Sequence, residues 1–333
     1  MLQTISRRAL LSVVALALVA GCSNSAGTTG GTSLTPGTNA AGAAVRYVKG
    51  PDVSGPIAIP LVRAKSNARV GWPDKKKKSI LFVADCSLGI LMYDPTVPNS
   101  GPTGSITSGT DCTFGVAVDK KGNLYSVNLG GNTLQIYAKG STSPTTTITN
   151  GIDGPYGVTV DSKGNVFVTN LNNNTVTGYA KGQTTAFETI DFNAYGQAVG
   201  IGVDKKNNVW VACDSSNAVF EIAAGTQTVT NAGLTGLSGP IGISFGQKDE
   251  IFVSSFATDV VQVYKYGTTS PFESLNSGIS GPTQNGVTHA GTFFQSNQDV
   301  NVVGFKKGQT SPFSALTGTS EPAGVAAWPL VKK

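Results

Sequence analysis

Residues 154–182 read GPYGVTVDSKGNVFVTNLNNNTVTGYAKG, and this stretch predicts three short β-strands joined by tight turns. Apolar residues alternate with smaller ones through Val158 and Val160, and this period of two is typical of a strand. The turn that follows, Asp-Ser-Lys-Gly-Asn, contains a glycine that can adopt the positive φ of a hairpin. An Asn-rich turn then leads to a third strand at residues 175–179, and a fourth strand is expected at residues 187–190.

The same pattern recurs along the chain at a nearly constant spacing. The glycine that opens each first strand marks the copies, which begin at Gly115, Gly157, Gly200, Gly242, Gly286 and Gly324. Successive differences between these positions are 42, 43, 42, 44 and 38 residues. A repeat of about 40–45 residues with four short strands is typical of one blade of a β-propeller. The second strands align as NLYSVN, NVFVTN, NVWVAC, EIFVSS and TFFQSN, so the phase persists through five complete copies.

The shared pattern has a glycine, alternating apolar residues and an aspartate, followed by Gly-Asn before the next apolar strand. It resembles the NHL-repeat β-propellers, and the whole chain resembles the exported bacterial lipoproteins that carry them. The resemblance covers residues 79–328 and implies a fold. It implies little about activity, because propellers of one fold host unrelated functions.

Counting strands predicts an all-β, six-bladed β-propeller of four-stranded blades, in which the N- and C-terminal strands share one blade. The segments ILFVAD, GILMYD and GSI supply strands two to four of a blade that lacks its first strand. At the other end GVAAW, residues 324–328, is a first strand without followers, so we expect it to pair with residues 80–84. Such pairing removes the open sheet edges of both termini. The alternative source of the missing strand is residues 68–72.

Composition favours one large all-β domain with a tether over two domains. The chain has 333 residues, of which 13% are charged and 42 are glycine. Its formal net charge of +5 falls to +3 without Arg7 and Arg8, which lie in a segment expected to be removed. This charge is too small to imply nucleic acid as a partner, and we expect a monomer.

Residues 1–21 are expected to be a lipoprotein signal peptide. Two arginines precede an apolar run of 12 residues, 9–20, which is too short to anchor the chain across a bilayer. The run is followed by Gly-Cys, and Val-Ala-Gly-Cys resembles a bacterial lipobox, which implies lipid attachment at Cys22. An ordinary signal peptide with a chance cysteine is the alternative. The arginine pair leaves export by the Sec or the twin-arginine route open.

The remaining chain divides into a tether and the propeller. Residues 22–66 are expected to be a flexible, lipid-anchored tether, because the Ser/Thr/Gly/Ala-rich part cannot bury a core. Residues 67–333 are expected to form the propeller domain. The serine at position 23, by resemblance to enterobacterial lipoproteins, favours the outer membrane within the cell envelope.

Three cysteines remain besides Cys22, in what we expect to be an oxidising compartment. Cys86 follows the second strand of the first blade, and Cys112 precedes the first strand of the next. These two strand ends share one face of a propeller, so Cys86 and Cys112 are a candidate disulfide, with Cys213 left as a buried thiol. The chain has no CxxC pair, and a zinc site is not expected.

Residues of catalytic type are few. The single histidine, His289, occupies the first-strand position that holds Val160 and Val203 in other copies, which favours packing between blades over catalysis. Asp119, Asp161 and Asp204 head the repeated turns, and their repetition indicates capping of turn amides.

The positions just before the marker glycines are a sharper test, because the gluconolactonase-like propellers, which this fold resembles, place metal ligands there. In this chain they hold Phe114, Tyr156, Val199, Ile241, Asn285 and Ala323. Of these six residues, only Asn285 could ligate a hard cation. A single amide oxygen cannot hold a divalent ion, so we expect no metal and no cofactor. The streptogramin-lyase-like propellers need a His/Glu pair, and the sequence identifies no acidic partner for His289.

These positions instead predict a largely apolar mouth, with Phe114, Tyr156 and Asn285 as candidate ligand-binding residues. The alternative is that these side chains only fill the central channel and form no ligand pocket. Two functions stay open: a non-enzymatic binding or scaffold propeller that contacts an envelope protein or glycan, and a propeller hydrolase or lyase with a diverged site. The apolar positions favour the first.

The turns that join strands one to two and three to four share one face in a propeller, and most lysines of the repeats lie in these turns. With the lysine run at 75–78, a lipid on Cys22 is expected to hold this face toward anionic head groups. A long tether that leaves the orientation free is the alternative. Replacing the lysines by glutamine should then weaken binding to anionic vesicles at low salt, and unchanged binding would reject the orientation.

Overall fold

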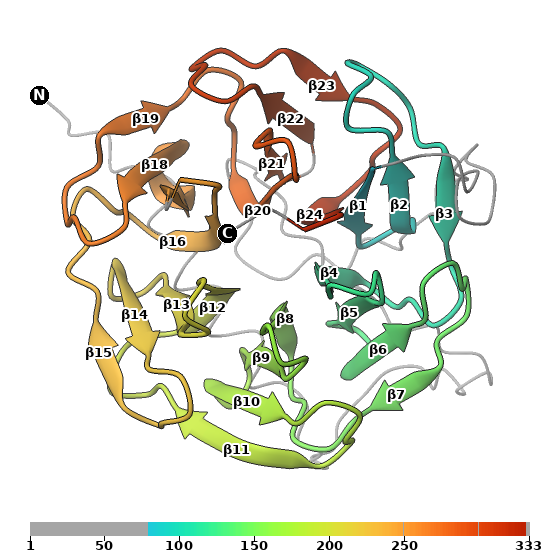
Figure 1. Ribbon diagram of the computed structural model, residues 1–333, viewed down its shortest axis with the longest axis vertical. Coiled ribbons are helices and arrows are strands. Elements are labelled where there is room, and N and C mark those ends of the chain that lie inside the picture. Colours follow the sequence, from blue (N-terminus) through green and yellow to red (C-terminus); the bar gives the residue numbers. More distant parts are fainter. Residues whose placement is uncertain (1–78, 249, 299, 331–333) are drawn as a thin grey trace, which may run out of the picture. The chain divides into compact units, whose positions relative to one another are not determined.

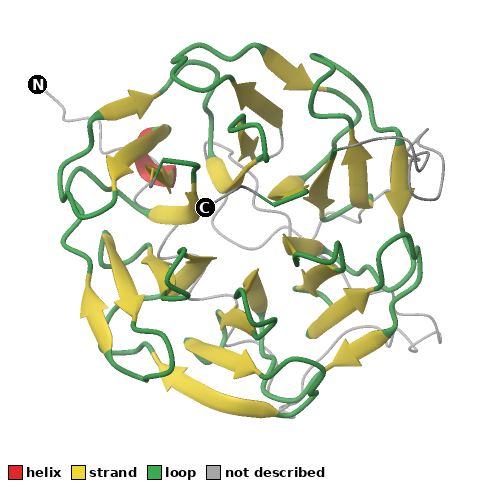
Figure 2. Ribbon diagram, viewed as in Figure 1, coloured by secondary structure: helices red, strands yellow, loops and turns green. Residues whose placement is uncertain are grey.

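Each repeat folds into one antiparallel sheet of four strands, and six such sheets form a ring (Figures 1 and 2). The computed structural model describes residues 79–330 except 249 and 299. The short turns of each repeat allow consecutive strands to pair with each other, since a two-to-five-residue loop favours an antiparallel hairpin. The predicted six-bladed, all-β propeller is confirmed.

The blades are numbered here from the one that contains β1. Blade 1 holds β24 (Pro322–Trp328), β1 (Ile80–Asp85), β2 (Gly89–Tyr93) and β3 (Gly104–Ile106). Blade 2 holds β4 (Thr113–Val118), β5 (Leu124–Asn128), β6 (Thr133–Tyr137) and β7 (Thr146–Ile148). Blade 3 holds β8 (Pro155–Val160), β9 (Val166–Asn170), β10 (Thr175–Tyr179) and β11 (Ala186–Asp191).

Blades 4 to 6 follow the same order from the innermost strand outward. Blade 4 holds β12 (Ala198–Val203), β13 (Val209–Cys213), β14 (Ala218–Ile222) and β15 (Val229–Asn231). Blade 5 holds β16 (Pro240–Phe245), β17 (Glu250–Ser255), β18 (Val260–Lys265) and β19 (Glu273–Leu275), with a short 3-10 helix, η2 (Phe256–Thr258), after β17. Blade 6 holds β20 (Pro282–Val287), β21 (Phe293–Asn297), β22 (Asn301–Phe305) and β23 (Ser314–Leu316).

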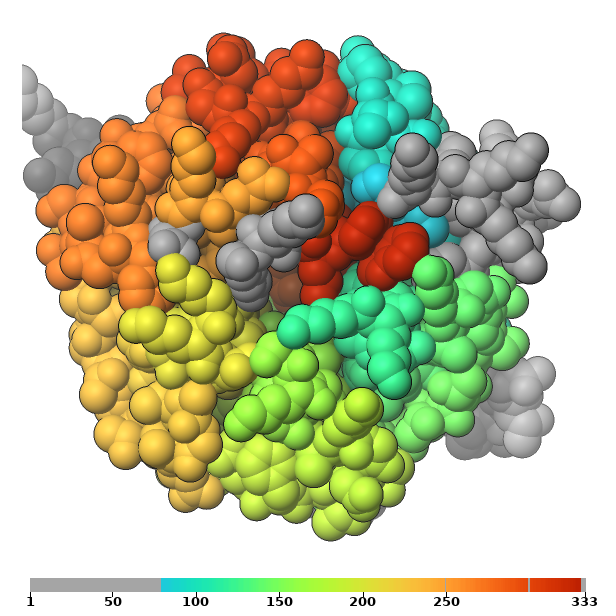
Figure 3. Space-filling model, in the orientation of Figure 1, coloured from blue at the N-terminus to red at the C-terminus, as the bar shows by residue number. Residues whose placement is uncertain are grey.

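The two ends of the propeller meet in blade 1. Strand β24 pairs antiparallel with β1, and the register runs from Ile80 opposite Trp328 to Ala84 opposite Gly324. In Figure 3 the cyan segment that follows residue 79 lies against the dark red segment near residue 325. The predicted closure is confirmed, and β24 occupies the edge of β1. Residues 68–72, the alternative source of that strand, lie outside the described residues.

A buried carboxylate fastens this closure. Asp85 ends β1, and its Oδ1 accepts the backbone N–H groups of Ser87 and Leu88 at 3.1 and 3.0 Å. Its Oδ2 accepts those of Ser320 and Glu321 at 2.7 and 3.0 Å, on the segment that enters β24. Burial raises the pKa of Asp85, and the four amide donors offset part of that rise. One side chain therefore ties the first described strand to the last.

The hydrophobic core is divided among the contacts between blades. Each of six buried clusters spans one pair of neighbouring blades; the cluster of blades 4 and 5, for example, joins Trp210 to Ile243 and Phe245. The innermost strands contact one another in the order β24, β4, β8, β12, β16, β20 and back to β24. No blade can bury its faces alone, so the ring is stable only as a whole.

The marker glycines have a physical cause in this ring. A Cβ on Gly115 would lie 2.7 Å from the carbonyl oxygen of Tyr156 in the next blade, and one on Gly157 would lie 2.9 Å from that of Val199. A Cβ on Gly200 would overlap the carbonyl oxygen of Ile241. The repeated glycine is therefore needed for the close approach of adjacent innermost strands.

The repeated aspartates cap the turns, as the sequence predicted. Oδ1 of Asp161 accepts the backbone N–H groups of Lys163 and Asn165, both at 2.8 Å. Its Oδ2 accepts the side-chain amide N–H of Asn165 at 2.9 Å. Asp119 and Asp204 make the same set of bonds in their own turns. Within residues 79–330 no helix has the length and apolar character needed to cross a bilayer.

Candidate functional site

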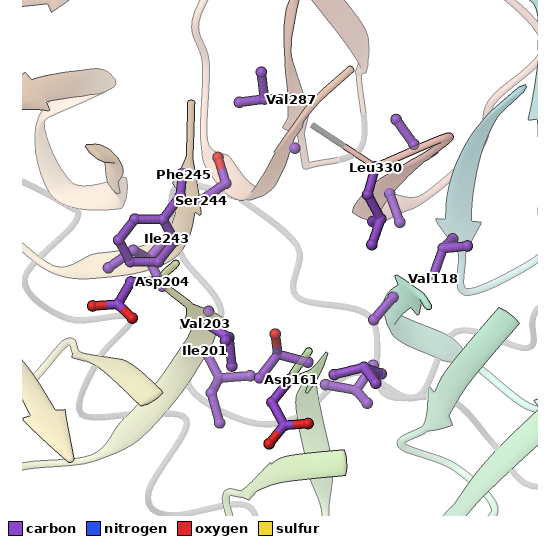
Figure 4. A pocket seen from close by; sticks show the side chains of 18 of the residues that line it. Val118, Asp161, Ile201, Val203, Asp204, Ile243, Ser244, Phe245, Val287 and Leu330 are labelled. Atoms are coloured by element: carbon purple, nitrogen blue, oxygen red, sulfur yellow. The ribbon is translucent and has the colours of Figure 1, made fainter. Parts of the chain in front are cut away.

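A cavity of about 650 Å³ lies at the centre of the ring, among the innermost strands of all six blades (Figure 4). Its size is within the range of small-molecule sites in proteins. In five blades the residue after the marker glycine contributes an apolar wall, made by Val116, Val158, Ile201, Ile243 and Val325, whereas in β20 the pairing register places Asn285 at this level. The next position holds small side chains that leave the space open, namely Ala117, Thr159, Gly202, Ser244 and Ala326.

The cavity reaches the face that carries the turns between first and second strands. Lys120, Ser162, Lys205 and Asn207 of these turns line it, together with Leu330 after β24. This is the face on which the sequence placed most lysines of the repeats. The opening is therefore apolar inside and polar at its rim.

The opposite end is closed by a bond across the ring. Gln284 of β20 donates its Nε2–H to the carbonyl oxygen of Tyr156 in β8 at 2.7 Å. Blades 6 and 3 are opposite each other in the ring, so this bond crosses the centre. The rings of Phe114 and Tyr156 pack at the same level, with centroids 4.6 Å apart. None of these three side chains lines the cavity, which consequently opens toward the lysine-bearing face.

The three candidate ligand residues do not form one mouth. Asn285 lines the cavity, whereas Phe114 and Tyr156 lie beyond its closed end. A β-bulge explains the difference, because Phe114 and Tyr156 sit where the strand register shifts in blades 2 and 3. In blade 6 the shift comes before Asn285, which is paired with Gln295 and keeps the alternation of the strand.

Two polar atoms in the cavity wall lack a hydrogen-bond partner among the described residues. They are Oδ1 of Asn285, a side chain that is 6% exposed, and Oγ of Ser244. Leaving a buried polar group unpaired costs about 1–3 kcal/mol. No sequence motif marks Ser244, although the aligned repeats place it where other copies have Ala117 and Gly202.

The carboxylates near the cavity are occupied by the fold. Figure 4 shows Asp161 and Asp204 at the rim with their carboxylates directed away from the centre. Asp204 caps its turn and also accepts the hydroxyl of Tyr266 at 3.0 Å and the indole N–H of Trp210 at 3.3 Å. Burial and the neighbouring Asp204 raise the pKa of Tyr266 to about 12. Among the described residues, no three His, Cys, Asp or Glu side chains are grouped closely enough to hold a metal ion.

His289 lies at the rim of the cavity. Its Nδ1 is 2.7 Å from the carbonyl oxygen of Leu330, and because a carbonyl only accepts, Nδ1 carries the proton. The side-chain amide of Gln247 donates to the backbone carbonyl of His289 itself. The ring is thus held in one tautomer by the segment that follows β24.

The cysteines lie on the face opposite the cavity opening. Cys86 and Cys112 form a disulfide that links the end of β1 to the residue before β4. Cys213 is a free, buried thiol, whose pKa is raised to about 12 by burial and by the neighbouring Asp214. A thiol with this pKa stays protonated at neutral pH and is a poor nucleophile. Cys22 lies outside the described residues.

Asp214 should make stability depend on pH. Burial raises the pKa of Asp214 from 3.8 to about 6, so between these values the folded chain keeps a proton that the unfolded chain has lost. The free energy of unfolding therefore falls as the pH rises through this window. Asp214→Asn is expected to increase it by about 1–2 kcal/mol at pH 7, a value discounted for partial exposure, and to change it little at pH 4.

Urea unfolding at the two pH values measures this effect. Asp191→Asn, at an exposed position of β11, is the matched control and should give the same small change at both. If Asp214→Asn increased the free energy of unfolding equally at pH 4 and pH 7, ionisation of Asp214 would not destabilise the folded chain.

Comparisons with known proteins show a fold and no family. No family model matches the chain, and no curated protein matches it. Solved structures do match: the nidogen/laminin complex has a chain with a TM-score of 0.62 and 12% identity, covering 75% of this chain and 98% of that one. A streptogramin B lyase has a TM-score of 0.50 and 13% identity, covering 71% of this chain and 73% of that one.

A catalytically inactive virginiamycin B lyase from Staphylococcus aureus with quinupristin gives a TM-score of 0.53 and 12% identity, covering 76% of this chain and 90% of that one. At such identities the likeness shows the propeller fold alone. The neighbours include a binding protein and lyases, and both kinds use this architecture.

Proposed function

We propose that this chain is a non-enzymatic binding propeller of the bacterial cell envelope, attached to the membrane through a lipid on Cys22. It acts as a monomer without a cofactor or nucleic acid, and a face of the propeller contacts an envelope protein or glycan. The outer membrane is the proposed location. The nidogen/laminin complex is one case in which a similar propeller serves binding.

One observation carries this proposal: the fold already uses the acidic groups at the cavity. General acid–base catalysis needs a titratable group within hydrogen-bond reach of the substrate. Asp161 and Asp204 accept turn amides instead, and the wall between them is apolar. An apolar wall with few polar anchors supports binding better than proton transfer.

A lyase of the streptogramin type is the second candidate. It is favoured by His289, whose ring lies at the rim of the cavity. Incubation of the purified protein with quinupristin distinguishes the two, because the binding proposal expects the compound to be recovered intact. Cleavage of quinupristin that is lost in His289→Ala would replace the binding proposal by the lyase.

The envelope anchor is tested by Cys22→Ala. With the lipid acceptor removed, we expect the protein to move from the detergent phase to the aqueous phase in a phase-partition experiment, because the proposed anchor is the lipid itself. Cys213→Ala is the control, since it removes a buried thiol and leaves Cys22 in place. Continued detergent partitioning of Cys22→Ala would contradict lipid attachment there.

A further inference from the structure

Hydrogen bonds among neighbouring side chains determine which atom of the Asn285 amide, oxygen or nitrogen, is the unpaired one. The first of these side chains is Gln295. Gln295 of β21 donates its Nε2–H to the carbonyl oxygens of Ser296 at 2.7 Å and Thr283 at 3.1 Å. These contacts require the amide nitrogen at that position, so Oε1 of Gln295 must point to the other side and accept. Its partner there is the hydroxyl of Ser254 in β17, at 2.6 Å.

Ser254 in turn determines the orientation of the Asn285 amide. Ser254 uses its single proton for Gln295 and can therefore only accept from Asn285. The Asn285 nitrogen lies 2.6 Å from the Ser254 oxygen and donates to it. The remaining atom of this amide, Oδ1, is the unpaired one, and the side chain is 6% exposed and lines the cavity. Flipping the amide would break the chain of bonds, so the buried, unpaired atom of Asn285 in the cavity wall is an acceptor.

Asn285 also lies at the closed end. The residue before it, Gln284, makes the bond across the ring to Tyr156. From there to the rim, the wall is largely apolar, with valine and isoleucine side chains and Phe245 among its residues. Ser244, on the adjacent strand β16, adds a second unpaired oxygen, which can donate or accept. A molecule that entered from the lysine-bearing face would pass the polar rim, then the apolar walls, and would meet a hydrogen-bond acceptor last.

We propose that the central cavity binds a small molecule with an apolar body and an N–H or O–H donor at its buried end, which bonds to Oδ1 of Asn285. Ser244 makes a second polar contact beside it. This inference rests on the proposed binding function in one respect: the ligand is held and not transformed. It is independent of the lipid anchor and of any macromolecular partner.

A matched pair of probes tests the donor. 2-Naphthol and 2-methoxynaphthalene share an aromatic body, and only the first has an O–H. Titration of each into the full-length protein, followed by calorimetry or by changes in protein NMR signals, should show that 2-naphthol binds about five- to tenfold more tightly. Failure of both probes to bind would overturn the proposal.

Three variants locate the interaction. Asn285→Ala should remove the preference for 2-naphthol, and Ser244→Ala should reduce it. Thr159→Phe, which places a ring among the small residues of the wall, should weaken both probes at least about tenfold by filling the space. Ser296→Ala is the matched control, because Ser296 also has a buried, unpaired hydroxyl but does not line the cavity.

The outcomes separate this proposal from the previous one. A preference that persists in Asn285→Ala, or unchanged binding by Thr159→Phe, means that the probes bind elsewhere and overturns the cavity site. If Asn285→Ala fails to fold, Ser244→Ala and Thr159→Phe still decide. Cleavage of quinupristin would reject the binding function while leaving the probe measurements intact.

Discussion

Removal of residues 321–333 is expected to abolish the cooperative unfolding transition of the propeller, or to lower its free energy of unfolding by at least about 5 kcal/mol. The deletion takes away β24, the innermost strand of blade 1, and exposes the edge of β1, whose six residues are all buried. It also removes the Val325 and Ala327 side chains from the core that joins blades 6 and 1. Strand β24 also lies between β20 of blade 6 and β4 of blade 2, so both of these strands lose their contacts with it.

Thermal unfolding followed by circular dichroism measures the loss. Deletion of residues 331–333 alone is the control, because it leaves every strand of the structure in place. An unfolding temperature shared by the two deletions would mean that the ring does not depend on this strand. Exposure of the β1 edge predicts in addition that the longer deletion aggregates, since unpaired strands recruit other chains.

Gly200→Ala is expected to have the second largest effect, a loss of about 3 kcal/mol or more in the free energy of unfolding. The added methyl group would overlap the carbonyl carbon and oxygen of Ile241, and backbone cannot move aside as a flexible side chain can. Relief would require β12 and β16 to separate, which would open the core between blades 4 and 5. Overpacking a close contact typically costs 1–3 kcal/mol, and backbone contacts lie at the upper end.

The matched control is Gly101→Ala. A Cβ at Gly101 would have its nearest neighbour, Oγ1 of Thr317, at 3.7 Å, and its φ is not positive, so the methyl group fits. We expect the control to stay within about 0.5 kcal/mol of the parent chain, since such surface substitutions are nearly neutral. If chemical unfolding gives the same midpoint for both variants, the close approach of the innermost strands is not what the marker glycine provides.

The sequence by itself was sufficient for the architecture. Alternating apolar residues, Gly-Asn turns and a glycine every 40-odd residues are local signals, and each is set by the backbone geometry of one strand or one turn. Counting the copies then predicted the ring and the pairing of residues 324–328 with residues 80–84, because a first strand without followers matches a blade without a first strand. The capping role of Asp161 followed from repetition in the same way.

Only the tertiary structure decided the site. Phe114, Tyr156 and Asn285 each precede a glycine in the sequence, yet the pairing register of β20 places Asn285 level with Val116 and Val158, so it alone of the three lines the cavity. The bond from Gln284 to Tyr156 joins residues 128 positions apart, and it forms only when opposite blades meet across a closed ring. The acceptor at Asn285 is likewise fixed by hydrogen bonds from two other strands. Such contacts depend on which side chains the closed ring brings together, and no local pattern in the sequence encodes them.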